Sequence, residues 1–220
     1  MTNSKIFGKI YANIYDEIYN YKNYAEECDI LEQIFKNKNN VSSVLDLGCG
    51  TGNHAAELST RGYSIVGLDQ SYQMIKVAQE KNLTDCVFKQ NDIRTFNLNQ
   101  SFDAVLLMFN VVGYLLDQNS LIALFSTARQ HLNTGGLLIF DFWYGPAIRH
   151  NPPSKTSKKR AKGDLRIYRK TIGKLDPKYN FIQINCDVKQ GSTKDRETHT
   201  VRYFDLDELR SLMLNTSFNN

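Results

Sequence analysis

Hydrophobic and polar positions follow two alternating patterns along the first 145 residues. The short apolar runs SSVLDL, YSIVGLD, DCVFKQND, FDAVLLMF and LLIFDFW predict β-strands, because an unbroken apolar run is typical of a strand covered on both faces. Between these runs, NHAAELSTRG, YQMIKVAQEKN and SLIALFSTARQHL place apolar residues at helical spacing. The alternation predicts a doubly wound α/β fold, with a mostly parallel sheet and helices on both faces.

The two ends of the chain follow other patterns. Residues 5–36 are predicted to be helical, and Tyr11, Tyr15 and Tyr19 recur every fourth position on one face. After Trp143, the Pro-, Ser- and Lys-rich stretch RHNPPSKTSKKRAKGD predicts a loop, and NTGG before LLIFDFW predicts a turn. LRIYRKTIG, NFIQINCDVKQG and THTVRYF predict an antiparallel insertion over about residues 164–204. The resulting division is a helical segment 1–40, an α/β core 41–145, a loop and insertion 146–204, and a C-terminal helix 205–220.

Composition limits the class of protein. The chain has 220 residues, 41% of them hydrophobic and 23% charged, as expected for one sizeable globular domain. No apolar run approaches the ~20 residues that span a membrane, and no signal peptide is evident. The four cysteines form no C-x-x-C pair and the four histidines show no metal spacing, so we expect no metal site, no disulfides and a cytoplasmic location. His150 and His199 flank the predicted insertion.

The net charge of +4 is unevenly distributed. Residues 149–170 hold nine lysines and arginines and one aspartate, which leaves 18 basic and 22 acidic residues elsewhere. One interpretation of this basic segment is a solvated surface loop. The alternative is a contact for an anionic substrate, such as a diphosphate or a nucleic-acid backbone.

The most informative stretch is LDLGCGTGN, residues 45–53, which follows the first predicted strand. Its glycines read G-x-G-x-G, and Asn53 stands where a dinucleotide fingerprint has its third glycine; no P-loop motif is present. Asp46 precedes Gly48 by two residues, and Asp69 ends the second predicted strand, where a carboxylate can accept both ribose hydroxyl protons. A carboxylate beside the loop disfavours a phosphate and favours a cationic ligand.

Four motifs in order, VLDLGCGTGNHA, IVGLDQS, QNDIRTF and FDAVLLMFNVVGYL, resemble those of class I S-adenosylmethionine-dependent methyltransferases over about residues 40–145. The resemblance implies a Rossmann-like fold, an enzyme, and S-adenosylmethionine as its cofactor. It further implies that Asp69 holds the ribose hydroxyls, Asp92 accepts from the adenine amino group, and Ile93 and Met108 enclose the ring. The alternative for Asp69 and Asp92 is strand-end capping, and for Met108 it is core packing. The expected cofactor contacts are Tyr11, Tyr15, Tyr24, Asp46, Gly48, Cys49, Gly50, Asp69, Gln70, Asp92, Ile93 and Met108.

The tyrosines near the N-terminus allow two interpretations. They form either an aromatic stripe packed against the sheet or a lid over the sulfonium of the cofactor. The stretch YDEIYNYKNY resembles the Y-D-x-x-Y that precedes the first strand in many small-molecule methyltransferases. This resemblance places Tyr15 at the site, and Tyr11 and Tyr24 beside it.

The methyl acceptor is expected after the fourth strand, at FNVVGYL. The [DNS]-P-P-[YFW] motif of base-modifying methyltransferases is absent there, which disfavours methylation of an exocyclic base nitrogen. Tyr114 either orients or deprotonates an amine or is a core tyrosine; Tyr15, Asn110 and Tyr114 are the candidate catalytic residues. FDFWYGPAIRH and THTVRYFDLDEL resemble sugar-nucleotide N-methyltransferases, in which a histidine stands where this chain has Tyr114. Substrate contacts are then expected at Trp143, Tyr144, Arg149 and Arg202.

Three hypotheses follow. The first is a methyltransferase for a small anionic substrate, with an amino group on a sugar nucleotide as the acceptor. The second is an RNA methyltransferase that uses residues 149–170 as its backbone contact, and the third is a non-catalytic version of the fold that acts through protein contacts. The class I fold closes with a hairpin of two strands, whereas this sequence stops at NTSFNN. We therefore expect a sheet without that hairpin, and a monomer or a homodimer formed through the open edge.

Overall fold

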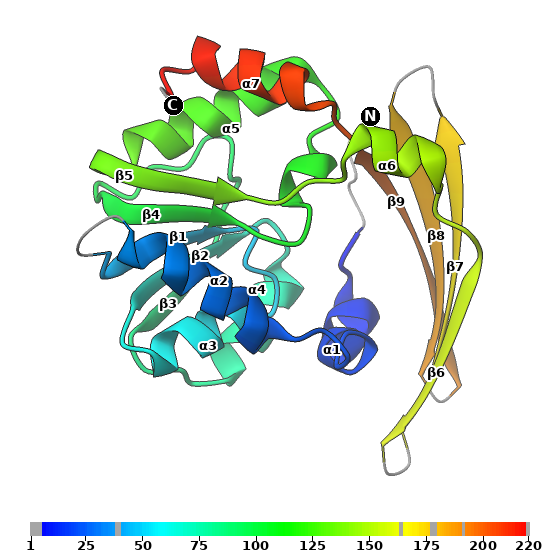
Figure 1. Ribbon diagram of the computed structural model, residues 1–220. Helices are drawn as coiled ribbons and strands as arrows, with labels where there is room; N and C mark the ends of the chain where they lie inside the picture. Colours follow the sequence, from blue (N-terminus) through cyan, green and yellow to red (C-terminus); the bar gives the residue numbers. More distant parts are fainter. Residues whose placement is uncertain (1–5, 38–40, 163–164, 177–179, 191, 219–220) are drawn as a thin grey trace.

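The computed structural model describes residues 6–37, 41–162, 165–176, 180–190 and 192–218. It consists of a five-stranded parallel sheet between two layers of helices and a four-stranded antiparallel sheet that stands opposite its carboxyl edge (Figure 1). This arrangement confirms the predicted doubly wound, Rossmann-like fold with an antiparallel insertion. In these parts of the chain no helix is long and apolar enough to cross a membrane.

The parallel sheet has the strand order β3-β2-β1-β4-β5. The order reverses between β1 and β4, so the carboxyl ends of β1, β2 and β4 meet at the position where open α/β sheets bind ligands. The strands are β1 (Ser43–Leu47), β2 (Ser64–Asp69), β3 (Cys86–Gln90), β4 (Phe102–Leu107) and β5 (Leu132–Phe140).

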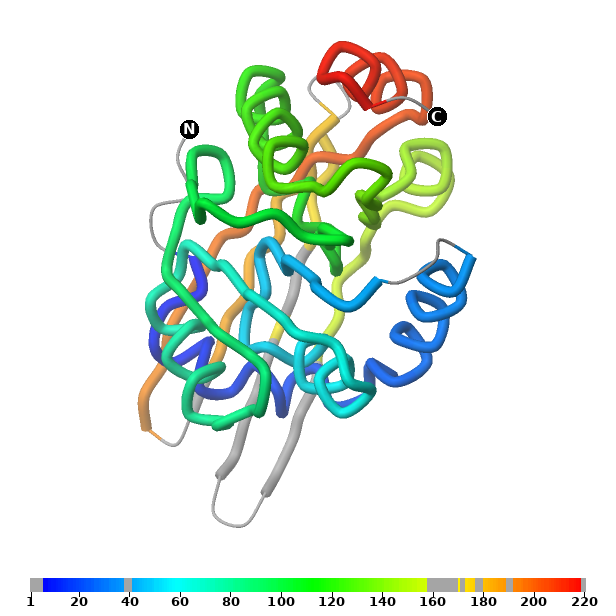
Figure 2. Tube along the Cα trace, turned by 90° about the vertical axis from the view of Figure 1, so that its left-hand side faces the viewer, coloured from blue at the N-terminus to red at the C-terminus, as the bar shows by residue number. Residues whose placement is uncertain are grey.

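Two hydrophobic cores flank this sheet because successive side chains of each strand point to opposite faces. Val44 and Leu106 belong to the core under one layer of helices, and Leu45 and Val105 to the core under the other. The C-terminal helix packs beside α5 on the second face (Figure 2). The first layer is α2 (Tyr24–Lys36), α3 (Asn53–Thr60) and α4 (Tyr72–Glu80), and the second is α5 (Gln118–Gln130) and α7 (Leu206–Asn215).

The N-terminal segment is not one helix. Helix α1 (Lys9–Ile18) ends five residues before α2 begins, and the side chain of Asn23 accepts a hydrogen bond from the amide of Glu26 as the N-cap of α2. Helix α1 lies between α4 and strand β8, where Ile14, Met74 and Cys186 share one hydrophobic cluster (Figure 1). Because of this break, α1, which carries Tyr11 and Tyr15, packs against the antiparallel sheet, whereas α2 packs against the parallel sheet.

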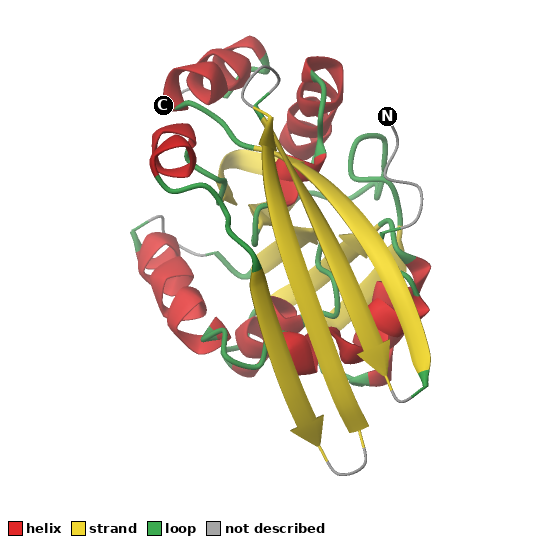
Figure 3. Ribbon diagram, turned by 90° about the vertical axis from the view of Figure 1, so that its right-hand side faces the viewer, coloured by secondary structure: helices red, strands yellow, loops and turns green. Residues whose placement is uncertain are grey.

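The antiparallel sheet is one strand larger than predicted. Its strands β6 (Thr156–Lys162), β7 (Leu165–Asp176), β8 (Phe181–Gln190) and β9 (Thr193–Arg202) pair in sequence order (Figure 3). The prediction of a loop over residues 149–164 was wrong for β6 and for the short helix α6 (Gly145–His150). Strand β6 carries no apolar alternation; its backbone pairs with β7 from Thr156 to Lys162, and its lysines suit an edge strand.

Strand β5 contains the second local difference. The predicted turn at residues 133–136 lies within β5 as a bulge, because Phe102 pairs with Leu132 whereas Ala104 pairs with Leu137. Gly135 supplies the left-handed conformation there, with φ +78°. Within the described residues no strand joins the outer edge of β5, as expected for a sheet without the closing hairpin.

The core below β4 provides a test of the fold. Leu106 is fully buried, so Leu106→Ala should lower the free energy of unfolding by about 2–5 kcal/mol through lost burial and a residual cavity. Leu214→Ala on α7, where the side chain is 61% exposed, is the matched control and should change little. Chemical denaturation of both variants measures the difference, and equal effects would contradict this core assignment.

Candidate active site

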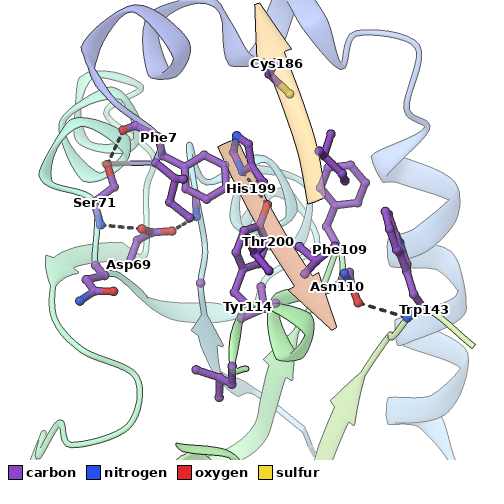
Figure 4. Close-up of a pocket in the computed structure, with 18 of the residues that line it drawn as sticks. Phe7, Asp69, Ser71, Phe109, Asn110, Tyr114, Trp143, Cys186, His199 and Thr200 are labelled. Atoms are coloured by element: carbon purple, nitrogen blue, oxygen red, sulfur yellow. Dashed lines mark hydrogen bonds between the residues drawn. The ribbon is translucent and has the colours of Figure 1, made fainter. Parts of the chain in front are cut away.

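A cavity of about 1710 Å³ lies between the carboxyl edge of the parallel sheet and the antiparallel sheet. Its wall combines the glycine loop, α1, the 3₁₀ helix η1 (Val111–Tyr114) and residues of β7, β8 and β9 (Figure 4). The volume exceeds the ~300–1,000 Å³ of a typical pocket for one ligand. Two ligands can therefore lie side by side in it, one at the glycine loop and one under the antiparallel sheet.

The glycine loop is tied closely to β2. The amides of Gly48 and Cys49 both donate to the carbonyl oxygen of Leu68, at 2.7 and 3.0 Å. A Cβ on Gly48 would lie 2.6 Å from Val111, and the φ of +76° there also requires glycine. At Gly50 a Cβ would meet no described atom within 4 Å. Bare main chain therefore faces open space at Gly50, as a ligand in close contact with the loop requires.

Asp69 is held at the end of β2 by two amides. Its Oδ2 accepts from Gly50 at 2.9 Å and its Oδ1 from Ser71 at 2.8 Å (Figure 4). Burial raises the pKa of this carboxyl, and the two amide donors oppose the rise. The carboxylate is thus fixed in place on the cavity wall, with lone pairs left for the hydroxyl groups of a ligand.

Asp46 is buried behind the loop and does not line the cavity. Its Oδ2 has no hydrogen-bond partner among the residues that the structure describes. Burial raises the pKa of Asp46 to about 6, with a smaller rise from Asp69 and an opposing effect of His54. Two acids close to the loop give an electronegative site that repels phosphate and attracts a cation. This donor set fits S-adenosylmethionine, which carries positive charge and no phosphate.

The residues expected around the adenine ring, Asp92, Ile93 and Met108, all line the cavity. Gln70, another expected cofactor contact, lines it too. However, the guanidinium of Arg94 holds the Asp92 carboxylate with Nε at 2.9 Å from Oδ1 and Nη2 at 2.5 Å from Oδ2, and lowers its pKa. An adenine amino group would therefore share Asp92 with Arg94, a contact that the sequence did not indicate.

The tyrosine stripe faces the cavity. Tyr11, Tyr15, Tyr19 and Tyr24 all line it, and the ring centroids of Tyr15 and Tyr19 are 4.7 Å apart. Burial raises the pKa of Tyr15 well above its usual value, and neighbouring tyrosines and Asp69 add to the rise. Burial likewise raises the pKa of Tyr24 to about 12. Tyr15 and Tyr24 therefore stay neutral, and neutral aromatic rings on the cavity wall are what a lid over a cation needs.

Asn110 connects the ends of β4 and β5. Its backbone has φ +60°, its amide donates to Asp141 at 2.6 Å, and its side-chain oxygen accepts from the amide of Trp143 at 3.1 Å (Figure 4). The side chain expected to act in catalysis is thus hydrogen-bonded to the backbone of Trp143. Trp143 and Tyr114 line the half of the cavity under the antiparallel sheet.

Three predicted substrate contacts lie outside the cavity. Tyr144 is 49% exposed, Arg149 pairs with Asp205 at 2.7 Å, and Arg202 pairs with Glu208 on α7. The described basic side chains of residues 149–170, which are Arg149, Lys155 and Lys170, also lie off its wall. Lys174 on β7, further along the chain, lines the cavity instead.

The sequence did not single out Phe7 or Glu197, which lie on or near the cavity wall, and it placed His199 only beside the predicted insertion. His199 Nδ1 lies 3.1 Å from the hydroxyl of Tyr114 (Figure 4). The sequence did carry a signal for this face: Glu197, His199 and Val201 occupy alternate positions of β9 and therefore point to the same side of the strand. All three are buried in the structure. Recognising it requires knowing that this face of β9 points towards the parallel sheet.

Comparison with known proteins agrees with this geometry. Residues 44–136 match the family model described as a methyltransferase domain. The chain is 35% identical over 139 residues to dTDP-3-amino-3,4,6-trideoxy-alpha-D-glucopyranose N,N-dimethyltransferase of Streptomyces venezuelae, a match that covers 62% of this chain and 58% of the relative.

Solved structures share the fold over nearly the whole chain. The crystal structure of Streptomyces venezuelae DesVI is 25% identical, with a TM-score of 0.80 and coverage of 95% of this chain and 90% of that one. S-adenosylmethionine-bound CalS10, an amino pentose methyltransferase from Micromonospora echinaspora, is 20% identical, with a TM-score of 0.76 and coverage of 96% and 89%. These matches support a class I S-adenosylmethionine-dependent methyltransferase, and among such enzymes the chain resembles the sugar N-methyltransferases.

Proposed function

We propose that this chain transfers the methyl group of S-adenosylmethionine to an amino group of a nucleotide-linked sugar. One observation carries the proposal: a single cavity joins an acidic glycine-loop half to a second half enclosed by the antiparallel sheet. Methyl transfer needs two adjoining ligands shielded from water, and this cavity has room for both. The relative that acts on a dTDP-linked amino sugar and the amino pentose methyltransferase support the choice of acceptor.

The cofactor half is assigned from the chain's own groups. Gly48 and Gly50 admit the methionine and ribose portions, and Asp69 accepts the ribose hydroxyl protons. Asp46 adds negative charge behind the loop. When bound, the cofactor supplies a methyl group on a sulfonium, which is an already activated leaving group.

The protein's part in the reaction is to align the ligands and to exclude water. Holding donor and acceptor in line is worth ~7–11 kcal/mol in effective concentration. Tyr15 lines the cavity and stays neutral because burial raises its pKa, so its ring and hydroxyl suit a positive sulfonium without forming a competing ion pair. No covalent intermediate with the protein is required.

The acceptor half suits a small molecule. Trp143 and Ile184 provide apolar surface for a deoxysugar, and Lys174 provides a cation for a phosphate. The described basic side chains of residues 149–170, which are Arg149, Lys155 and Lys170, lie off the wall and so give the RNA alternative no support. An anionic sugar nucleotide is therefore the substrate class that the cavity supports best.

Cofactor binding can be tested at Asp69. Asp69→Asn should weaken S-adenosylmethionine binding by about 10–100-fold, because a charged acceptor for two hydroxyls is lost. Calorimetric titration measures the dissociation constant, and Asp207→Asn, whose native side chain is 97% exposed on α7, is the matched control. An unchanged affinity in Asp69→Asn would contradict the assignment of the ribose site.

The pH dependence of binding tests Asp46. Its pKa of about 6 in the free protein means that lowering the pH from 7 to 5 neutralises it, whereas a bound cation favours the ionised form. Binding should therefore release a proton, and affinity should fall about tenfold over this range. The Asp46→Asn variant lacks this titrating carboxyl, so its affinity for S-adenosylmethionine, measured by calorimetry, should change less between pH 7 and pH 5. The same dependence of affinity on pH in the wild-type protein and in Asp46→Asn would refute the electrostatic role of Asp46.

The acceptor is tested by product mass. Incubation with S-adenosylmethionine and a dTDP-linked amino deoxysugar should yield product carrying one or two added methyl groups, detected by mass spectrometry. The corresponding hydroxyl sugar nucleotide is the control and should remain unmodified. Methylation of RNA, with no methylation of any amino sugar nucleotide, would overturn the proposal.

A further inference from the structure

Two polar side chains from two layers of the protein, Tyr114 and His199, meet on the wall of the acceptor half of the cavity, and Glu197 lies behind them. Tyr114 ends the 3₁₀ helix after β4, and its hydroxyl lies 3.1 Å from Nδ1 of His199 on β9 (Figure 4). Nε2 of His199 lies 3.2 Å from Oε2 of Glu197, two residues earlier on the same strand. The side chains of His199 and Glu197 are only 4% and 2% exposed. The order hydroxyl, imidazole, carboxylate therefore runs from the cavity into the antiparallel sheet.

The surroundings of His199 favour this order. The titratable groups that face it are Tyr11 of α1, Tyr114 of η1 and Glu197 of β9, and the aromatic ring of Phe7 closes the remaining side. On β8, the residue in register with His199 is the apolar Ile184, and Cys186 stands opposite Glu197. Among these neighbours Glu197 supplies the negative charge that can stabilise an imidazolium.

Glu197 is itself held rigidly. Its Oε1 accepts from the amide of Gly8 at 2.7 Å, and its Oε2 accepts from the amide of Phe7 at 2.8 Å. These donors compensate the buried charge of the carboxylate and fix it beside the imidazole. The contact with His199 Nε2 is within ion-pair distance but outside hydrogen-bond geometry, so it tightens when the ring becomes charged.

We propose that Tyr114, His199 and Glu197 form a proton relay that deprotonates the acceptor amine, an inference that rests on the proposed function. The ammonium form of the acceptor gives a proton to the Tyr114 oxygen as the Tyr114 hydroxyl proton passes to Nδ1 of His199. One N–H and one O–H bond break, and one O–H and one N–H bond form. The free amine keeps its lone pair for the methyl group, and the imidazolium proton leaves to solvent after product release.

The relay explains why an imidazole is buried at this position. A phenol alone is a weak base near neutral pH, whereas a neutral imidazole next to a carboxylate accepts a proton readily. Tyr114 and His199 both line the cavity, so they are the catalytic residues of the relay. Glu197 acts through His199 and is a positioning residue.

The kinetic test compares Tyr114→Phe and His199→Gln with Tyr203→Phe, a buried tyrosine outside the cavity wall. Both relay variants should lose about 100-fold in kcat/KM near pH 7, the usual size of a general-base effect. They should recover towards high pH, where the amine loses its proton in solution. Calorimetry should give wild-type cofactor affinity in all three. Wild-type pH profiles in both relay variants would overturn the proposal.

A second measurement needs no substrate and therefore separates failure of the relay from failure of the proposed function. Nitrogen-15 NMR of the imidazole rings, with His199 assigned by its loss in His199→Gln, should show a proton on Nε2 and none on Nδ1. Tyr114→Phe should shift the Nδ1 resonance, and Tyr203→Phe should not. A proton on Nδ1 in the wild-type protein would refute the relay even if amino sugars are methylated. The predicted tautomer without methylation of any amino sugar would refute the proposed acceptor alone.

Discussion

The site depends on the contact between the glycine loop and β2. Two amides of the loop share the carbonyl oxygen of Leu68, and a third amide, from Gly50, reaches the carboxylate of Asp69. The chain can pass this close because Gly67 of β2 has no side chain; a Cβ there would lie 2.6 Å from Phe88 and 2.9 Å from Cys49. The conformation of the glycine loop in the cofactor half of the cavity is thus fixed by hydrogen bonds within the protein, without a ligand.

The other half of the cavity depends on elements distant in sequence. Helix α1 places Tyr11 and Tyr15 between α4 and the antiparallel sheet. Strand β9 brings His199 to Tyr114 across 85 positions of sequence. The parallel sheet alone would leave its carboxyl edge open to water. The insertion after β5 converts that edge into an enclosed space in which electrostatic interactions are stronger.

The sequence predicted the parallel sheet and its helices, because the spacing of apolar residues determines them. It also predicted that Gly48, Gly50, Asp69 and Tyr15 lie at the cavity, because local motifs mark these positions. Prediction from the sequence failed where a residue's interaction partners are distant in sequence, or where a segment has a weak intrinsic preference for strand or helix. Strand β6 is lysine-rich and forms through pairing with β7. Arg149 and Arg202 were expected to contact substrate because of the resemblance, but acids on neighbouring segments pair with them. The sugar-nucleotide N-methyltransferases that the sequence resembles have a histidine where this chain has Tyr114; here β9 brings His199 beside Tyr114.

The attachment of the N-terminal segment has a kinetic consequence. Phe7 and Gly8 are fastened to Glu197 by two amide hydrogen bonds, and the carbonyl of Phe7 accepts a third from the hydroxyl of Ser71. Ser71 follows the strand that carries Asp69, so this short stretch bridges the two ligand compartments. Moving this stretch away from the cavity would require these three bonds to break together, at a cost of about 2–4 kcal/mol. Such an opening would loosen both compartments in one step, and it would be rarer than the opening of a stretch held by a single hydrogen bond.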